Sequence, residues 1–150
     1  WGYPWLINPH ATVPMVAGQL DEYRQALSRA GLEYPQTWPM MRELYVAEDR
    51  DMAYLESQPY LEAKYAAYAS WGQDKAMPGG ESFSVPYKDL AKDRFLLGSP
   101  DDVVDEINRY GEELGVNYMI FRMQWPGMDQ KFALRQIEIM GRDVISRLKN

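Results

Sequence analysis

Residues 98–124 read GSPDDVVDEINRYGEELGVNYMIFRMQ and carry the clearest helix and strand signals of the chain. Ser99 suits a helix N-cap and Pro100 suits the first helical position, while the two aspartates that follow favour the positive end of the helix dipole. Gly115 predicts the end of this helix, because glycine readily adopts the left-handed conformation beyond a last turn. Residues 116–124 then predict a strand with apolar residues on both sides, which is typical of a parallel strand covered by helices. The buried stripe of the helix is expected to be Val103, Ile107, Tyr110 and Leu114.

Upstream of this unit, the sequence predicts two more strands, each followed by helical sequence. Residues 5–7 form a short apolar run closed by Asn-Pro, and residues 40–47 form a longer run after two prolines. A helix with one apolar face is predicted between them, with Thr12 as its N-cap and Gly31 as its stop. Three β-α units in this order predict an α/β fold with a parallel sheet and right-handed crossovers.

The remaining segments give weaker signals. Residues 48–72 predict helical structure that is interrupted at Pro59. Residues 73–93 show no sustained period, so we expect a long excursion on the surface, of the kind that forms lids. After a turn at residues 125–128, a last helix is predicted. Its inward-facing residues are expected to be Ala133, Ile137, Met140, Val144 and Leu148.

Composition excludes several classes of function. The chain of 150 residues has 16 Lys and Arg against 22 Asp and Glu, a net charge of −6, which argues against a nucleic-acid partner. It has no Cys and one His, so disulfides, cysteine nucleophiles and ordinary zinc sites are excluded. No apolar run approaches the ~20 residues of a membrane span. We therefore expect a soluble, cytoplasmic protein with neither a membrane nor a nucleic-acid partner.

Five phrases, in order, resemble the carboxy-terminal part of bacterial-luciferase-like flavin monooxygenases. They are Asn8-Pro9-His10, PYLEAKY at 59–65, WGQDK at 71–75, DRFLLGSP at 93–100 and QWPGM at 124–128. The resemblance implies the last three β-α units of a TIM (β/α)8 barrel. It also implies an enzyme that uses reduced FMN, or a deazaflavin, with dioxygen to oxidise a small organic substrate, and a flavin reductase as a possible electron source.

Three β-α units cannot close a barrel, because closure requires a consistent strand number, tilt and stagger. We therefore expect residues 1–150 to be one domain, a partial barrel whose amino-terminal half lies upstream of this sequence and contributes most of the flavin contacts. Open edges of a hydrophobic sheet require cover, so a missing half or a dimer mate is the expected partner, and a homo-oligomer is expected. The chain alone is expected to be inactive; the alternative is a non-catalytic assembly module that pairs with another chain or copy.

In such barrels the chemistry lies at the carboxyl ends of the strands. After the first strand, His10 is the candidate catalytic residue, since it could donate a proton to the flavin, and Asn8 is a candidate cofactor contact. After the third strand, Gln124 and Trp125 are candidate cofactor contacts, and Trp125 could stack on the flavin ring or cover the barrel mouth. For His10 the alternative is a turn histidine bonded to backbone.

Four further residues are candidates for the substrate pocket: Trp5, Arg42, Arg122 and Met128. Trp5 could equally fill the core. Arg122 could face inward, where an acid such as Glu43 would be expected nearby because an unpaired buried charge is unfavourable, or it could reach solvent. Arg42 has the same ambiguity on its own strand. No metal site, phosphate-binding loop or serine nucleophile motif is present.

Overall fold

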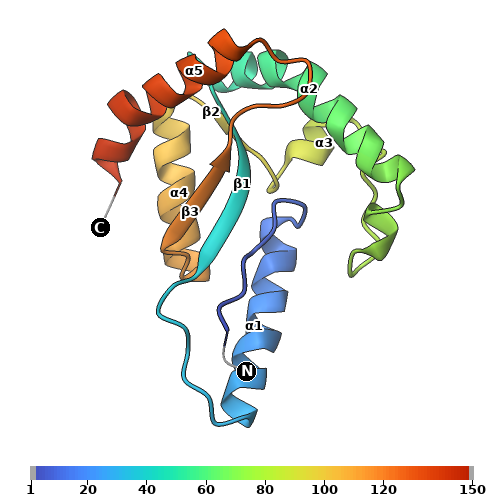
Figure 1. Cartoon of the computed structure of the whole chain (residues 1–150), viewed down its shortest axis with the longest axis vertical. Coiled ribbons are helices and arrows are strands. Elements are labelled where there is room, and N and C mark those ends of the chain that lie inside the picture. Colours follow the sequence, from blue (N-terminus) through green and yellow to red (C-terminus); the bar gives the residue numbers. More distant parts are fainter. Residues whose placement is uncertain (1–2, 149–150) are drawn as a thin grey trace.

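A parallel sheet of three strands in the order β2-β1-β3 forms the centre of the computed structural model, which describes residues 3–148 (Figure 1). The strands are β1 (Pro39–Val46), β2 (Leu96–Gly98) and β3 (Tyr118–Arg122). The helices are α1 (Val13–Arg29), α2 (Arg50–Ser70), α3 (Tyr87–Ala91), α4 (Pro100–Leu114) and α5 (Gln130–Ile139). Three short helical turns are η1 (Asp74–Ala76), η2 (Met140–Val144) and η3 (Ile145–Arg147). The predicted α/β class with a parallel sheet is confirmed.

Strand β1 lies at the centre of the sheet, between the two strands that follow it in the sequence. Its second half pairs with β2, where Leu44 is opposite Leu96, and its first half pairs with β3, where Glu43 is opposite Arg122. The crossovers through α2 and α4 therefore run in opposite directions, and right-handed connections place these two helices on opposite faces of the sheet. In a closed barrel, consecutive strands are neighbours and the helices form one outer ring. In this chain, by contrast, helices cover both faces of β1.

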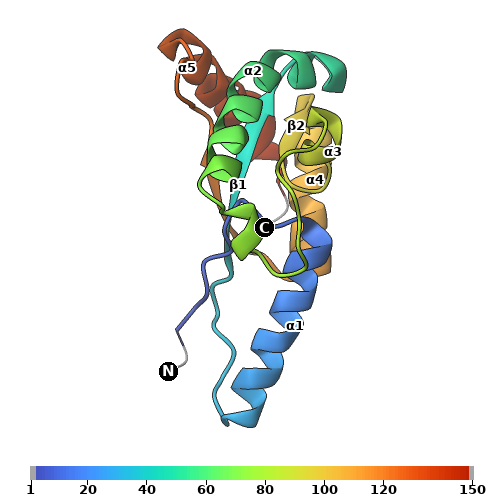
Figure 2. The ribbon, with the colours of Figure 1, turned by 90° about the vertical axis from the view of Figure 1, so that its right-hand side faces the viewer.

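Alternate residues of β1 accordingly face two separate apolar cores. Leu44 and Val46 pack with residues of α1 and α4, and we call this side the α4 face. Tyr45, and Ala47 directly after the strand, pack with residues of α2 and α3, and we call this side the α2 face. Figures 1 and 2 both show α1 extending well below the sheet, so only part of this helix contributes to the core.

The first predicted strand is reduced to a single bridge. Ile7 donates its N–H to the carbonyl of Pro39 at 2.9 Å and accepts from the N–H of Met41 at 2.8 Å, which makes it a parallel neighbour of Met40. Two residues later, Pro9 has no N–H with which to continue a ladder. The prediction of a strand was therefore right in direction and position but wrong in extent.

Strand β2 is absent from the sequence-based prediction. It has three residues, and Leu96 and Leu97 face different cores, so neither length nor alternation marks it. Strand β3 was predicted, but its burial on both sides was overestimated. Because β3 lies at the edge of the sheet, its residues are half-buried, and Tyr118 is 56% exposed.

Helix α2 runs without a break through Pro59, so the predicted interruption is wrong. Proline removes the hydrogen bond to the carbonyl four residues earlier, which belongs to Leu55. Leu55 is 64% exposed and Pro59 is exposed too, so water can satisfy this carbonyl. Neither α2 nor any other helix within residues 3–148 is both long and apolar enough to cross a membrane.

Residues 73–93 are mostly exposed and irregular apart from η1 and α3, as predicted, but several buried side chains anchor the segment to the core. Phe83, Tyr87 and Leu90 are buried in the α2-face core. The buried side chain of Asp74 accepts hydrogen bonds from the N–H groups of Lys75 at 2.9 Å and of Phe83 at 3.3 Å, which fixes the start of the segment to its middle. Buried aromatic residues that are separated by irregular chain show no regular spacing in the sequence, so periodicity does not predict their burial.

The last helix shows a shifted inward face. Ala133, Met140 and Val144 are buried as predicted, but Ile137 is 55% exposed and the polar Gln136 is buried in its place. The Gln136 side chain accepts from the N–H of Val46 at 2.6 Å and donates to its carbonyl at 2.9 Å. It thereby satisfies the edge of β1 beyond the point where β3 ends, which periodicity in apolar residues cannot predict.

Candidate functional site

The segment of residues 8–10, which follows the Ile7 bridge, is held in place by its backbone. Each of its three carbonyl groups accepts a hydrogen bond from a buried side chain of a different element. In order along the segment, the donors are Arg42 Nη1 (3.1 Å), the Tyr65 hydroxyl (3.2 Å) and Arg94 Nε (2.8 Å). The side chain of Asn8 also accepts from the N–H of His10 at 2.9 Å. The backbone that carries His10 is therefore fixed by β1, by α2 and by the turn before β2.

The His10 ring lies among aromatic rings. Its centroid is 5.0 Å from that of Tyr68, 5.8 Å from that of Tyr65 and 6.1 Å from that of Phe83. Its Nδ1 is buried and makes no hydrogen bond in the described structure. Burial, reinforced by the positive charge of Lys64, holds the pKa of His10 below its ordinary value. The imidazole is consequently neutral at physiological pH.

Glu43 is the polar centre of the α2 face. Its carboxylate is fully buried and pairs with Lys64 Nζ of α2 and, at 3.3 Å, with Arg122 Nη1 at the end of β3. It also accepts a hydrogen bond of 2.6 Å from the indole N–H of Trp125. We call these four residues the Glu43 cluster. One carboxylate thus joins three segments of the chain, with two cations on a single anion.

Strand register explains why His10 and the Glu43 cluster lie at the same level of the sheet. Ile7 is opposite Met40 and Arg122 is opposite Glu43. His10 and Glu43 each lie three residues beyond the bridge, and the charge of Glu43 acts on the pKa of His10, raising it against the larger effect of burial. We call the chain that forms the Ile7 bridge and continues to residue 10 the Ile7 segment. Its carboxyl end and that of β3 lie on either side of the middle of β1.

Three of the predicted site residues meet here: His10, Arg122 and Trp125. The expected acid beside Arg122 is Glu43, as predicted for an inward-facing arginine. Trp125 is almost fully buried, with its ring 6.2 Å from that of Tyr45 in a stacked arrangement, so its N–H rather than its ring face is available to the site. Asn8 holds the segment through its side chain and carbonyl.

Two of the other predicted residues, Arg42 and Trp5, lie on the α4 face, away from this cluster. Arg42 is on the α4 face, opposite Arg122, because neighbouring strand residues point to opposite sides. Trp5 packs beside Tyr23 and the α4-face core, with their ring centroids 6.3 Å apart. Met128 is buried in the α2-face core, and Gln124 is exposed.

Sequence reasoning assigned no role at the site to Lys64, which completes it, and it weighed Tyr65 only as one of a series of helical tyrosines that either bind a ligand or pack against the sheet. A usable signal exists, because Lys64 follows the buried Leu61 by three residues and therefore lies on the buried side of α2. Burial lowers the pKa of Lys64, and the adjacent carboxylate of Glu43 opposes this effect. A lysine at such a position indicates an acid across the interface.

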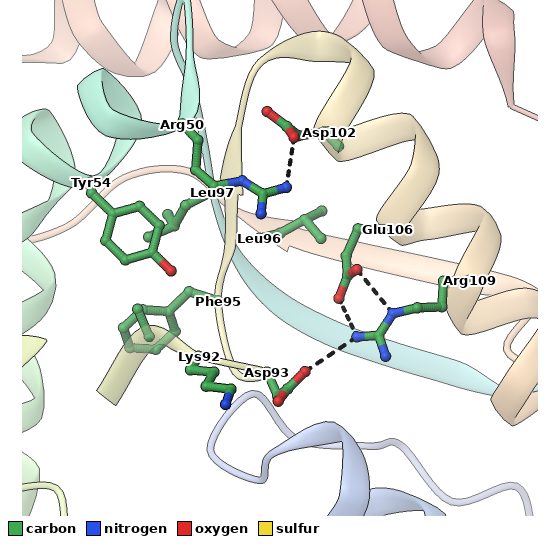
Figure 3. Close-up of a pocket in the computed structure, with 12 residues that line it drawn as sticks. Arg50, Tyr54, Lys92, Asp93, Phe95, Leu96, Leu97, Asp102, Glu106 and Arg109 are labelled. Atoms are coloured by element: carbon green, nitrogen blue, oxygen red, sulfur yellow. Dashed lines mark hydrogen bonds and ion pairs between the residues drawn. The ribbon is translucent and has the colours of Figure 1, made fainter. Parts of the chain in front are cut away.

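A separate cleft of about 350 Å³ lies beside β2, between α2 and α4 (Figure 3). Its arginines are paired with acids: Arg50 with Asp102 at 2.6 Å, and Arg109 with Glu106 at 2.5 Å and with Asp93 at 3.5 Å. None of the predicted site residues lines this cleft. Its charges neutralise one another and join helices across β2, which is a structural role.

The chemistry that the described residues allow is limited and specific. Within residues 3–148 no group of His, Asp and Glu side chains is suited to hold a metal ion. The His10 imidazole, the partly exposed Arg122 and the exposed Gln124 provide a neutral proton acceptor, a cation and an amide. Such groups can hydrogen-bond to a polar ligand and take part in proton transfer.

Comparisons with known proteins identify the fold. No family model matches the sequence. An F420-dependent glucose-6-phosphate dehydrogenase from Segniliparus rotundus is 36% identical over 67 residues, which are 45% of this chain and 18% of that protein. The crystal structure of monooxygenase RslO1 from Streptomyces bottropensis matches 97% of this chain and 42% of its own, with a TM-score of 0.70 and 20% identity.

A second solved structure agrees. The oxygenating constituent of 3,6-diketocamphane monooxygenase from Pseudomonas putida, a type II Baeyer-Villiger monooxygenase in complex with FMN, matches 90% of this chain and 40% of its own, with a TM-score of 0.61 and 17% identity. The chain therefore shares its fold with part of these two monooxygenase structures, which agrees with the resemblance that its motifs predicted. It spans less than half the length of these structures.

Proposed function

We propose that this chain forms part of a flavin-dependent oxidoreductase, a monooxygenase of the luciferase-like kind that acts on a small organic substrate with reduced flavin and dioxygen. The observation that carries the proposal is the convergence of His10 and the Glu43 cluster where the Ile7 segment and β3 end. Active sites of such barrels lie at the carboxyl ends of their strands. The match in fold over nearly the whole chain supports the same assignment.

The described residues fit one side of a flavin site. Arg122 keeps 37% of its side chain exposed while it pairs with Glu43, and Gln124 is exposed, so a guanidinium and an amide are available to the polar edge of a flavin ring. The flavin itself would supply the redox chemistry. His10, held neutral and fixed through its backbone, would accept or return a proton at its imidazole. Trp125 would act by orienting Glu43.

The cofactor is proposed as reduced FMN, with a deazaflavin as the alternative. The Pseudomonas structure holds FMN, whereas the Segniliparus relative depends on F420. A flavin reductase would supply electrons to free FMN.

The partner is proposed to be an amino-terminal half barrel or a second copy of the chain. Strands β2 and β3 both form open edges of the sheet. Open edges of this kind are covered in stable proteins. We accordingly expect the chain alone to show no turnover. The second candidate function, a non-catalytic assembly module, is favoured by the same open edges.

A reconstitution experiment separates the two functions. The chain is mixed with the amino-terminal part of RslO1, which it does not span, and FMN fluorescence and oxygen uptake with a flavin reductase are measured. Quenching of FMN fluorescence and oxygen uptake that needs both parts support the oxidoreductase. A stable complex with neither signal supports the assembly module and contradicts the enzyme.

A matched pair of variants locates the site within the complex. Arg122→Gln removes the partly exposed cation beside Glu43, and Arg147→Gln removes an arginine on the exposed surface, where it pairs with Asp101. The first substitution is expected to weaken FMN binding several-fold and the second to leave it unchanged. Equal effects of the two variants would contradict the placement of the flavin beside Arg122.

A further inference from the structure

The cleft of about 350 Å³ between α2 and α4 contains hydrogen-bond donors that its ion pairs do not use (Figure 3). Its volume is within the range of small-molecule sites, ~300–1,000 Å³. The pairs of arginine and acid join the helices across β2, so a ligand must be recognised by the polar groups that these pairs leave free.

The acids on the α4 side of the cleft are saturated by bonds within the chain. Both oxygens of Glu106 accept from Arg109, at 2.9 and 2.5 Å. One oxygen of Asp102 accepts from Arg50 at 2.6 Å, and the other accepts from the N–H and the hydroxyl of Ser99 at 2.9 and 2.8 Å. Neither carboxylate therefore has an oxygen that lacks a donor, and neither is available to bind a cation.

The α2 side of the cleft, by contrast, has free donors. Arg50 uses only its Nη2 in the pair with Asp102, so its Nε and Nη1 have no partner within residues 3–148. The hydroxyl of Tyr54 makes no hydrogen bond there either, and burial raises its pKa, so it stays protonated and can donate at neutral pH. Arg50 and Tyr54 are four residues apart, which places them on the same face of α2. Figure 3 shows both side chains directed into the cleft.

The far end of the cleft is different in charge. Asp93 accepts from Arg109 at only 3.5 Å, so it is the least saturated acid, and Lys92 beside it is exposed and has no side-chain partner within residues 3–148. Figure 3 shows both of them at the opposite end from Arg50. An anion that bound at Arg50 and Tyr54 would therefore be kept apart from Asp93, and the ammonium of Lys92 would partly offset that carboxylate.

The lining limits the class of the ligand. Three cations and three acids line the cleft, so their charges cancel, and a dianion would be repelled more strongly than a monoanion. Phe95, Leu96 and Leu97 provide apolar surface next to the donors. Arginine and hydroxyl donors match a carboxylate, and hydrogen bonds to a charged group are stronger than those to a neutral one. These features together favour a carboxylate that carries a small apolar group.

We propose that this cleft is a binding site for one small organic monocarboxylate. The carboxylate accepts from the free nitrogens of Arg50 and from the Tyr54 hydroxyl, and the apolar group of the ligand lies against Phe95 and Leu97. The site is separate from the proposed flavin site, because neither His10 nor any residue of the Glu43 cluster lines it. Its test therefore needs no flavin and no partner chain.

The first test measures binding of sodium benzoate to the purified chain by isothermal titration calorimetry, without flavin. Benzamide has the same ring without the charge, and benzylammonium has the opposite charge. We expect saturable binding of one benzoate per chain, with much weaker binding of benzamide, benzylammonium and inorganic phosphate. Equal binding of benzoate and benzamide would overturn the proposal, as would the absence of saturable binding of benzoate.

Variants locate the site. Tyr54→Phe removes only the hydroxyl and is expected to raise the dissociation constant of benzoate about tenfold, as loss of a hydrogen bond to a charged group would. Arg50→Gln is expected to raise it at least as far, and Asp102 stays bonded to Ser99 in this variant. Arg142→Gln is the control, because Arg142 is 73% exposed and pairs with Asp143 outside the cleft. If Arg50→Gln binds benzoate as the parent chain does, the proposed contact is wrong.

A direct test maps the ligand on the unmodified chain. Amide resonances followed by NMR during a benzoate titration are expected to shift at residues 50–54 and 91–97, which border the cleft. Shifts centred on His10 and Arg122 instead would mean that benzoate enters the proposed flavin site, and they would overturn the assignment of the cleft without contradicting the proposed function.

Discussion

Arg42 and Glu43 are neighbours on β1, but their side chains point to opposite faces of the sheet and differ in how their charges are paired. Glu43 faces α2 and receives three donors, from Lys64, Arg122 and Trp125. Arg42 faces α4, where its Nη1 donates to two backbone carbonyls and its guanidinium lies beside Tyr110, and no carboxylate of residues 3–148 forms an ion pair with it. A strand buried on both faces places both of its charges inside. Whether each charge is satisfied depends on the layer that covers it.

The difference indicates what each face does. The Glu43 cluster ties β1, α2 and the segment after β3 together, and it holds Arg122 where part of its guanidinium remains exposed. A fully connected polar group of this kind defines a single geometry, which a site for chemistry requires. The α4 face is mainly an apolar core, and its one buried arginine forms no ion pair with a carboxylate of residues 3–148. Substitutions should therefore have unequal effects on the two faces.

The largest effect is expected for Glu43→Gln. The change removes the only anion of the cluster and leaves Lys64, whose side chain is almost fully buried, without its partner. Removing one member of a buried ion pair typically destabilises a protein by about 3–5 kcal/mol. The free energy of unfolding in urea at pH 7 measures this loss.

The matched control is Asp101→Asn. Asp101 pairs with Arg147 on the surface, where its side chain is 78% exposed. Exposed pairs of this kind contribute about 0–1 kcal/mol, so little change is expected. If the two substitutions have equal cost, the Glu43 cluster does not hold the α2 face together.

Trp125→Phe sharpens the comparison by removing one donor while keeping an aromatic ring. The indole N–H bonds to a buried carboxylate, and hydrogen bonds to charged groups contribute about 1.5–3 kcal/mol. We expect a loss of about 2 kcal/mol in the free energy of unfolding. Tyr45→Phe is the control, because it keeps the stacked partner of Trp125 and removes only a hydroxyl bonded to Glu56. A loss for Trp125→Phe no larger than for this control would mean that packing alone holds Trp125.

The comparison also shows what sequence patterns can predict. Strand β1 and helix α4 were predicted because length, alternation, caps and apolar spacing agree there. For an inward-facing Arg122, an acid such as Glu43 or one from the missing half was predicted nearby, because an unpaired buried charge is unfavourable, and Glu43 is the acid found there. Strand β2 was missed, because three residues show no period. The reversal of strand order at β1 was missed as well, because local signals do not specify which strand is the neighbour.

Two buried polar residues illustrate the remaining gap. Gln136 was passed over in favour of Ile137, because apolar spacing does not register a side chain that bonds to the edge of a strand. Lys64 was passed over because lysine is expected at surfaces. Both bury polar groups only because a partner from a distant segment is present, and that partner is visible only in the folded chain.

A smaller effect is expected from pH. Burial, with the charge of Lys64, lowers the pKa of His10 in the folded state below its unfolded value of about 6.5. The folded chain then binds fewer protons than the unfolded chain, so this contribution to stability is present above about pH 6.5 and is lost as the pH falls toward the folded pKa. His10→Gln should lose less stability between pH 7.5 and pH 5 than the parent chain.

The chain has one histidine, so its pKa can be read without ambiguity. The imidazole C–H resonance followed by NMR should titrate below pH 6.5 in the folded chain and shift toward 6.5 in urea. Glu43→Gln should lower the folded value further, because Glu43 raises the pKa of His10. A resonance that titrates above 6.5 in the folded chain would contradict the position of His10 among buried rings and cations.

The smallest change in stability is expected for Arg122→Gln, although the proposed function assigns this residue an important role. Arg122 is 37% exposed, and Glu43 keeps Lys64 and Trp125 as partners after the substitution, so a loss below about 1 kcal/mol is expected. Urea unfolding measures this loss, and FMN fluorescence in the reconstituted complex measures binding. A large loss of FMN binding with little loss of stability would mean that the exposed part of the guanidinium serves a ligand. In the reverse result, stability falls as far as in Glu43→Gln while FMN binding is kept. This result would mean that Arg122 has a structural role and that the flavin site lies elsewhere.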